Sequence, residues 1–330
     1  MSASALIDQF GRHFDYARIA VTERCNLRCV YCMPESGVDF VGGERLLTTE
    51  EIARLVEILS RLGVRKLRFT GGEPLIRKDI VQLVSRAARL PAVEQVHITT
   101  NGILLRRYLD RLVDAGLSGV NISLDTLQEQ RFRQITRRDT LSDVIGAIDS
   151  AVERLRTVKI NVVAMRGVND DELVDFARLT TTLPVTVRFI ELMPFDSDQV
   201  WETGRFLGVD RMKSILMETW PQMVPLQGSS TETWSARIPG GRGQVALIPA
   251  FTRSLCGQCN RIRVTADGRL RNCLYSESEY SLRNVLRGNG TDEDIIRVLR
   301  RGVYEKAEDG WVAQRASQKR FRVSMTQIGG

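Results

Sequence analysis

Six cysteines are the residues of this sequence whose type and spacing most directly suggest chemistry. They form two groups of three, Cys25, Cys29 and Cys32 and then Cys256, Cys259 and Cys273, with no cysteine between the groups. The chain has only two histidines, His13 and His97, so a metal site built from several imidazoles is poorly supplied. A disulfide framework is not expected in a chain of 330 residues in which no secretory signal is visible. The two groups therefore predict metal sites with thiolate ligands.

The two groups differ in spacing, and each has an alternative interpretation. Three thiolates spaced C-x3-C-x2-C on one short loop can hold three irons of a four-iron four-sulfur cluster and leave the fourth iron open to a small molecule. A zinc site with a remote fourth ligand, or free structural thiols, is the alternative. The C-x2-C pair of the second group is also common in zinc ribbons, but no later Cys or His supplies a fourth zinc ligand. A second open cluster is the better prediction.

The elements that must position these groups are short β-rich runs alternating with amphipathic helical patterns. The predicted strands are Arg18–Val21, Lys66–Phe69, Val96–Thr99, Gly119–Leu124, Val158–Ala164 and Val185–Ile190. The predicted helices are Thr49–Leu62, Lys78–Arg89, Leu104–Ala115, Leu141–Arg154 and Glu172–Thr180. Thr48 and Glu51 form a capping-box pattern at the start of the first helix.

Six successive βα units with right-handed crossovers predict an α/β fold, an open (β/α)6 partial barrel. Periodicity alone does not exclude a flat doubly wound sheet. After about residue 220 the pattern changes to a turn at 239–241, a short strand at Gln244–Ile248 and the second cysteine group. We therefore expect a partial barrel over 1–220 and a smaller cluster-binding extension over 221–330.

Ligands of parallel βα folds gather at the carboxyl ends of the strands. The second predicted strand ends in Gly71-Gly72-Glu73-Pro74, where the glycines permit close backbone approach and Glu73 can accept a hydrogen bond from an ammonium group. A plain glycine turn is the alternative. Ser123 follows the same logic at the fourth strand, although a serine there also suits a helix cap.

The charge balance favours anionic ligands. The formal net charge is +7, and 41 arginines stand against 6 lysines. Arginine suits phosphate as well as carboxylate, but no run of five or six like charges suggests a nucleic-acid-binding arm, and compositional bias explains part of the arginine excess. No G-x-x-x-x-G-K-[ST] loop is present, so a bound triphosphate must be neutralised by side-chain cations. No apolar run is long enough to span a membrane, and we expect a cytoplasmic protein.

The C-x3-C-x2-C loop followed by GGEP resembles the radical S-adenosylmethionine (SAM) superfamily. The resemblance implies that methionine groups of SAM occupy the open iron of the first cluster. It also implies SAM contacts at four positions: Tyr31, Gly72, Ser123 and Met193. Read without the resemblance, Tyr31 is as well explained by packing, and Met193 by core filling.

Runs along nearly the whole chain are similar to the GTP 3′,8-cyclase family of molybdenum cofactor biosynthesis. Among them are YARIAVTERCNLRCVYCMP, LRFTGGEPLIRKD, RFIELMP, CGQCNRIRVTADG and the terminal Gly329-Gly330. The resemblance implies a lyase with two four-iron four-sulfur clusters and SAM, in which a 5′-deoxyadenosyl radical removes hydrogen from C3′ of GTP. It assigns GTP contacts to Arg18, Arg68, Thr99, Lys159, Arg261 and Arg263, with Arg188 a further candidate and with Arg261 and Arg263 catalytic.

The family resemblance also implies partners and leaves two rival functions. An electron donor and a downstream pyranopterin-forming enzyme are implied, with a monomer or homodimer and no nucleic acid or membrane partner. The chain departs from the family pattern between Lys306 and Val323, just before the Gly-Gly tail expected in the active site. One rival is a peptide-modifying radical enzyme, which would need a peptide-binding module and more cysteines. The other is a non-enzymatic, metal-binding nucleic-acid-binding protein, which leaves the first motif unexplained.

Overall fold

The computed structural model describes residues 5–34, 37–194, 203–228, 232–317 and 324–327, and their strands form one sheet. The sheet has twelve strands in the order β12-β11-β10-β1-β2-β3-β4-β5-β6-β9-β8-β7. The first six are β1 (Tyr16–Ala20), β2 (Lys66–Thr70), β3 (Gln95–Thr100), β4 (Gly119–Ser123), β5 (Thr157–Ala164) and β6 (Val185–Glu191). The later ones are β7 (Val224–Leu226), β8 (Trp234–Arg237), β9 (Gln244–Ile248), β10 (Arg261–Val264), β11 (Arg269–Arg271) and β12 (Glu279–Ser281).

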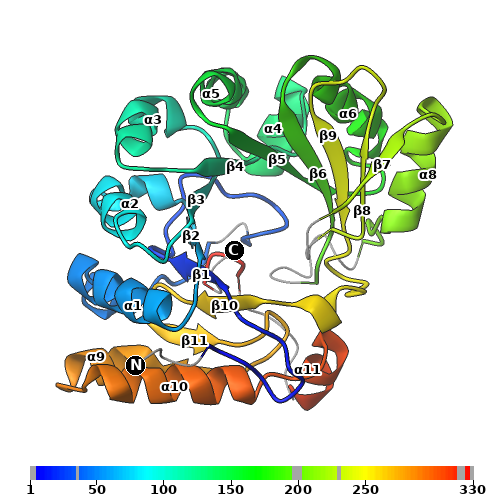
Figure 1. The fold of residues 1–330 in the computed structure, drawn as a ribbon. Coiled ribbons are helices and arrows are strands. Elements are labelled where there is room, and N and C mark those ends of the chain that lie inside the picture. The colour runs from blue at the N-terminus through cyan, green and yellow to red at the C-terminus, as the bar shows by residue number, and fades with distance from the viewer. Residues whose placement is uncertain (1–4, 35–36, 195–202, 229–231, 318–323, 328–330) are drawn as a thin grey trace.

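Every strand pairing from β10 through β1–β6 to β9 is parallel, and the outer pairings on both sides are antiparallel. The sheet curves strongly, and its two ends do not pair, so the barrel is open (Figure 1). The predicted open partial barrel is confirmed, and the flat doubly wound alternative is wrong because the helices following β1–β6 cover only the outer face.

The helices joining the parallel strands lie on the convex side of the sheet (Figure 1). They are α1 (Thr49–Arg61), α2 (Ile80–Ala88), α3 (Leu105–Asp114), α4 (Glu129–Thr136), α5 (Leu141–Arg154), α6 (Leu173–Thr182) and α8 (Val209–Thr219). The C-terminal helices are α9 (Leu282–Arg287), α10 (Asp292–Tyr304) and α11 (Gly310–Ala316). The five predicted helices are present, and the predicted capping box of Thr48 and Glu51 is formed. No helix among the described residues combines the length and the apolar character needed to cross a membrane.

The two faces of the parallel strands differ in chemistry. Side chains such as Ile19, Phe69 and Ile98 are fully buried in the apolar core between the sheet and the helices. Because side chains alternate along a strand, the neighbours Arg18 and Arg68 point the other way, into the barrel. The inner face is therefore charged and polar, and the barrel encloses a cavity where an ordinary (β/α)8 barrel has a packed core.

The segment after residue 220 completes the sheet on both sides. Strand β9 pairs with β6, and β10 pairs with β1. The strand predicted at Gln244–Ile248 is β9. Since residues before and after 220 share one sheet, the division into 1–220 and 221–330 stays a prediction about sequence organisation.

Candidate active site

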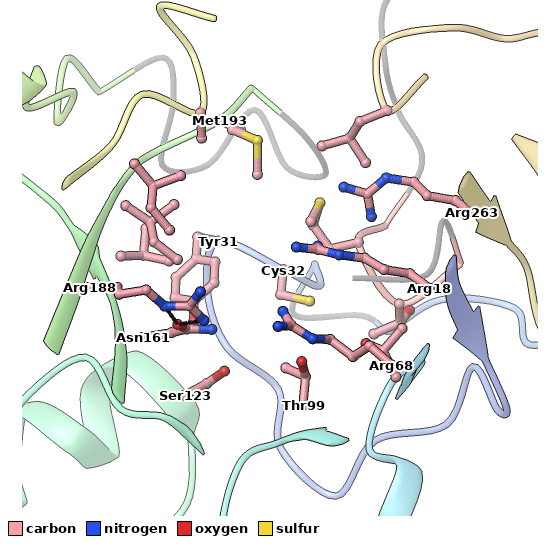
Figure 2. A pocket seen from close by; sticks show the side chains of 18 of the residues that line it. Arg18, Tyr31, Cys32, Arg68, Thr99, Ser123, Asn161, Arg188, Met193 and Arg263 are labelled. Atoms are coloured by element: carbon pink, nitrogen blue, oxygen red, sulfur yellow. Dashed lines mark hydrogen bonds between the residues drawn. The ribbon is translucent and has the colours of Figure 1, made fainter. Parts of the chain in front are cut away.

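A cavity of about 330 Å³ lies inside the curved sheet, and all six cysteines line it. Each cysteine is a free thiol. The two groups, separated by more than 200 residues of sequence, thus face the same space (Figure 2 shows part of this cavity). Spacing had predicted each group separately, but only the curvature of the sheet brings both to one cavity.

The loop with the first cysteine group is held by the end of α4. The backbone N–H of Arg28 donates to the carbonyl of Thr136 at 3.1 Å. Arg137, with a left-handed φ of 59°, donates from its guanidinium to the carbonyls of Arg28 and Met33 at 3.0 and 3.3 Å. Helix α4 was not predicted, because its charged sequence EQRFRQIT offers little apolar periodicity. Its C-terminal end nevertheless fixes the outer side of this loop.

The two glycines of the GGEP turn are required by the backbone that precedes Cys25. A Cβ atom on Gly71 would lie 2.2 Å from the carbonyl oxygen of Thr22, and one on Gly72 would lie 2.2 Å from that of Arg24. The N–H of Gly72 donates to the Thr22 carbonyl at 2.9 Å. The predicted close approach is therefore confirmed, and it joins the end of β2 to the cysteine loop.

Glu73 is held in place by hydrogen bonds from three groups of the protein. Its carboxylate accepts hydrogen bonds from the N–H groups of Leu75 and Asn101 at 2.9 and 2.7 Å and from the Thr100 hydroxyl at 2.8 Å. Burial raises its pKa to about 7, although the N–H donors lower it. The side chain is 1 % exposed and does not line the cavity, so it joins the end of β2 to the end of β3. Its predicted hydrogen bond from an ammonium group stays a prediction.

The four positions assigned to SAM line the cavity together: Tyr31, Gly72, Ser123 and Met193. The Tyr31 hydroxyl donates to Asp125 at 2.6 Å, and Asp125 also accepts from the N–H of Val163 at 2.8 Å. Burial raises the pKa of Asp125 to about 6, while these two donors lower it. Asp125 thus ties the cysteine loop to the ends of β4 and β5.

Cations line the cavity on facing walls. In Figure 2, Arg18, Arg68 and Arg263 lie on one wall and Arg188 on the other, with Thr99 below. Burial and the neighbouring arginines together lower the pKa of Arg68 to about 9, although Tyr16 raises it. Burial likewise lowers that of Arg263 well below its ordinary value. Such repulsion among buried cations means that the cavity attracts an anion.

Arg188 is oriented by two asparagines that were not predicted as site residues. Its Nε and Nη2 donate to Asn161 Oδ1 at 3.0 and 2.6 Å, and Nη2 also donates to Asn121 Oδ1 at 2.7 Å. Burial lowers its pKa to about 10, while the nearby Glu232 raises it. Residues of β4, β5 and β6 therefore fix one guanidinium in the cavity wall. Their polar side chains at strand interiors were the available signal.

Lys159 is the one predicted GTP contact that does not line the cavity. It lies on β5 at the inward register, with its Nζ 4.0 Å from Glu232. Burial and Arg188 together lower its pKa to about 8, although Glu232 raises it. Its predicted contact with GTP stays a prediction.

The second cysteine group lies in a basic environment made by distant segments. Burial raises the pKa of Cys259, but Lys306 and Arg261 lower it by more, to about 6. The N–H of Gly310, the first residue of α11, donates to Cys256 Sγ at 3.4 Å. The guanidinium of Arg253 stacks between the rings of Tyr275 and Trp311, with its Cζ 3.4 and 3.9 Å from the ring centroids.

A residue near the N-terminus holds the segment around the second cysteine group by hydrogen bonds. Arg12 donates to the carbonyls of Cys256, Ala307 and Glu308 at 2.9, 2.7 and 2.6 Å. Lys306 donates to the carbonyl of Asn272. The segment that departs from the family pattern therefore packs against the second cysteine group as far as the structure describes it.

The residues present fit iron-sulfur clusters. Each group supplies three thiols on the cavity wall, and N–H groups point at their sulfurs, from Leu27 to Cys25 at 3.4 Å and from Gly310 to Cys256. Hydrogen bonds of this kind accompany cluster ligands. Among the described residues, no three His, Cys, Asp or Glu side chains come together around a single metal ion.

The C-terminal tail reaches the cavity as far as it is described. Met325 and Thr326 line the cavity, and the Ser324 hydroxyl donates to the carbonyl of Cys32 at 2.7 Å. Gly329 and Gly330 lie outside the described residues, so their predicted place in the active site stays a prediction.

An open parallel barrel with a C-x3-C-x2-C loop packed against a GGEP turn defines an enzyme of the radical SAM class. Residues 19–180 match the radical SAM superfamily, and residues 185–311 match the family described as Molybdenum Cofactor Synthesis C. The chain is 45% identical over 326 residues to the GTP 3′,8-cyclase of Chlorobaculum tepidum, covering 98% of this chain and 97% of that protein. This chain belongs to the GTP 3′,8-cyclase family.

Animal relatives are longer. The chain is 46% identical to Molybdenum cofactor biosynthesis protein 1 of Homo sapiens over 91% of this chain but 48% of that protein, and 48% identical to the Bos taurus protein, also over 48% of its length. The chain thus spans about half the length of these relatives.

Solved structures share the fold. Streptococcus suis SuiB bound to S-adenosylmethionine has a TM-score of 0.61 at 12% identity, over 83% of this chain and 64% of that one. The structure titled native anSMEcpe with bound AdoMet has a TM-score of 0.59 at 15% identity, over 92% and 84%. At these identities the likeness concerns the fold alone, and it carries no argument for a peptide substrate.

Proposed function

We propose that this chain is a GTP 3′,8-cyclase, which converts GTP to 3′,8-cyclo-7,8-dihydro-GTP in the first step of molybdenum cofactor biosynthesis. One observation carries the proposal: two groups of three free thiols and a set of buried arginines line a single cavity. A radical initiator needs only the first group. The second group and the cations make the same cavity suitable for a polyanionic substrate with a metal-binding base.

The residues around the first group would hold a four-iron four-sulfur cluster and SAM. When bound, this pair supplies the 5′-deoxyadenosyl radical that removes hydrogen from C3′ of GTP. Tyr31, held by Asp125, fixes the cysteine loop, and the glycine backbone at Gly72 leaves room beside it. Ser123 and Met193 complete the proposed SAM contacts from β4 and from the end of β6.

The substrate side is built from cations. A triphosphate bound inside a barrel loses its hydration, and several charge-assisted hydrogen bonds are needed to replace it. Arg18, Arg68 and Arg263 supply such donors from one wall, and the fixed fork of Arg188 supplies them from the other. Arg261 lies beside Cys259, where a guanine held at the second cluster would meet it. The enclosed position also limits water, which a radical reaction requires.

The proposal extends to partners and location. The chemistry consumes electrons, so a one-electron donor is required, and its cyclic product needs a second enzyme to form the pyranopterin. We propose a cytoplasmic location, where a reducing environment keeps the six thiols free for iron. Whether the protein acts as a monomer or a homodimer stays a prediction.

The test is an anaerobic assay with GTP carrying deuterium at C3′. The protein is reconstituted with iron and sulfide, to about eight irons per chain if two clusters form. Dithionite, SAM and labelled GTP are added, and the products are followed by mass spectrometry. The proposal expects a cyclised nucleotide and deuterium in 5′-deoxyadenosine.

Two controls separate the parts of this proposal. Replacing Cys256, Cys259 and Cys273 by Ala removes the second group and leaves the first, so SAM cleavage by dithionite should persist while cyclised nucleotide disappears. Unlabelled 5′-deoxyadenosine formed at the same rate without GTP would keep a radical initiator but contradict GTP as the substrate.

A further inference from the structure

Tyr16, at the start of β1, is buried at the base of the barrel, where cations surround it. It is 5 % exposed and does not line the cavity. The terminal groups of Arg18, Lys66 and Arg68 lie 5.6, 5.5 and 5.3 Å from the centroid of its ring. Its hydroxyl accepts a hydrogen bond from Arg18 Nε at 3.3 Å. The phenol therefore lies directly behind arginines that face the substrate cavity.

Charged groups reach this region from several strands. They are Arg18 on β1, Lys66 and Arg68 on β2, Arg188 on β6, and Arg261 and Arg263 on β10. His97 on β3 stays neutral, because burial and the cations lower its pKa to about 2. Glu232 is associated with Lys159 and Arg188 across the barrel.

The charges around Tyr16 are thus strongly positive, and an acidic group placed among them gains from ionising. Burial by itself raises the pKa of Tyr16, but Arg18 and Arg68 lower it by more, to about 7. A phenylalanine would fill the same space and keep the ring faces for the cations. Packing alone does not explain the hydroxyl.

We propose that Tyr16 is the internal counter-ion of these cations: its phenol is ionised while the cavity lacks a polyphosphate, and it takes up one proton from solvent when a nucleoside triphosphate binds. The triphosphate brings several negative charges to the same arginines, so the field that ionises Tyr16 is cancelled. Tyr16 acts through Arg18 and Arg68 and is a positioning residue. The identity of the nucleotide rests on the proposed function, whereas the proton uptake requires only a polyphosphate.

This linkage has a defined sign. Because the ligand-bound form holds the extra proton, raising the pH above about 7 opposes binding. One linked proton changes the dissociation constant by at most about tenfold per pH unit. The nucleotide and Lys159, whose pKa is about 8, also titrate in this range in every variant, so only differences between variants report on Tyr16.

The experiment measures GTP binding calorimetrically on the cluster-loaded protein, without reductant, between about pH 7 and 8. Titrations in two buffers of different ionisation enthalpy give the number of protons taken up. Wild type should take up more protons than Tyr16→Phe, with a difference approaching one per site. Tyr108→Phe is the matched control, because the Tyr108 ring lies 5.9 Å from both Arg107 and Arg111 on the outer helix α3. It should behave like wild type.

Equal proton uptake by wild type and Tyr16→Phe would overturn the proposal. If Tyr16→Phe does not fold, Lys66→Met is measured instead. It removes a cation beside the ring, so the pH of greatest proton uptake should move upward. An unchanged pH of greatest uptake would overturn the proposal. If GTP does not bind to wild type, the proposed function fails, and the same titrations are made with inorganic tripolyphosphate. Absence of tripolyphosphate binding, or binding with no proton difference, would overturn the role of Tyr16 itself.

Discussion

The hydroxyl of Tyr31, a residue between two cysteines of the first group, donates a 2.6 Å hydrogen bond to Asp125 at the end of β4. This contact joins a loop that carries three thiols to the rigid sheet. Asp125 is 5 % exposed, so its charge depends on the two donors it has. Positioning of the first cluster therefore depends on a bond between two side chains that are 94 residues apart.

Tyr31→Phe should loosen the cysteine loop. Removing a donor from a buried carboxylate costs about 1.5–3 kcal/mol. We expect faster loss of iron from the first cluster to a chelator and slower SAM cleavage by dithionite. Both are measured in the background lacking Cys256, Cys259 and Cys273.

Asp125→Asn tests whether the faster loss of iron in Tyr31→Phe arises from the unpaired carboxylate of Asp125. In the Tyr31→Phe background the neutral amide leaves no unpaired buried charge, so the double variant should lose iron more slowly than the two single effects predict. Strictly additive effects would contradict the coupling.

Glu73→Gln should flatten the pH dependence of stability. Burial raises the pKa of Glu73 to about 7, above its ordinary 4.5. A raised carboxyl pKa stabilises the folded state below pH 4.5, and that contribution is lost as the pH rises through about 7. The loss amounts to about 3 kcal/mol.

Thermal unfolding of wild type and Glu73→Gln across this pH range checks the sign. Glutamine does not titrate and leaves one N–H donor without an acceptor, so the variant is the less stable protein at about pH 5. The difference between the two melting temperatures should shrink toward about pH 8. A difference that grows with pH would contradict the assignment.

Gly72→Ala should displace the backbone before Cys25. The new Cβ would lie 2.2 Å from the Arg24 carbonyl oxygen, and backbone on both sides leaves no flexible group to yield. Overpacking of this kind costs about 1–3 kcal/mol. We expect fewer irons bound at the first site and weaker SAM binding by equilibrium dialysis. Gly43→Ala, where no atom lies within 4 Å of the added Cβ, is the matched control and should match wild type.

Arg253→Lys should weaken the second site while leaving the first intact. Lysine keeps the charge but loses the planar stack between Tyr275 and Trp311, and it cannot reproduce the two bonds to the Gly310 carbonyl and Gln314 at 2.7 and 2.5 Å. We expect the lost interactions to cost about 1–3 kcal/mol of stability. The loss falls on the start of α11, where the N–H of Gly310 donates to Cys256.

Two measurements check Arg253→Lys. The first is the electron paramagnetic resonance spectrum of the second cluster, in a protein in which Cys25, Cys29 and Cys32 are all replaced by Ala. The second is the rate of proteolysis within residues 306–317. Exposed Arg211→Lys is the control. A normal cluster spectrum with an unchanged cleavage rate in Arg253→Lys would show that α11 does not support the second site.

Helices and strands with strong apolar periodicity were predictable from the sequence. Those whose positions depend on tertiary contacts were not. The predicted helix Leu141–Arg154 has the bounds of α5, because its apolar residues recur on one face. Helix α4 and strands β10–β12 were not predicted, since they are short and charged residues interrupt their apolar pattern. Their positions come from tertiary contacts, such as the parallel pairing of Arg18 on β1 with Arg263 on β10.

The sequence by itself determined the thiol groups and the alternating βα pattern, because spacing and periodicity are local properties of a chain. Tertiary structure alone decided which groups face each other. It joined Glu73 to Thr100 and Asn101, set Asn161 and Asn121 against Arg188, and placed Tyr16 behind the arginines. The physical reason is that burial and electrostatic fields depend on through-space neighbours, and the curvature of the sheet brings those neighbours from strands far apart in sequence.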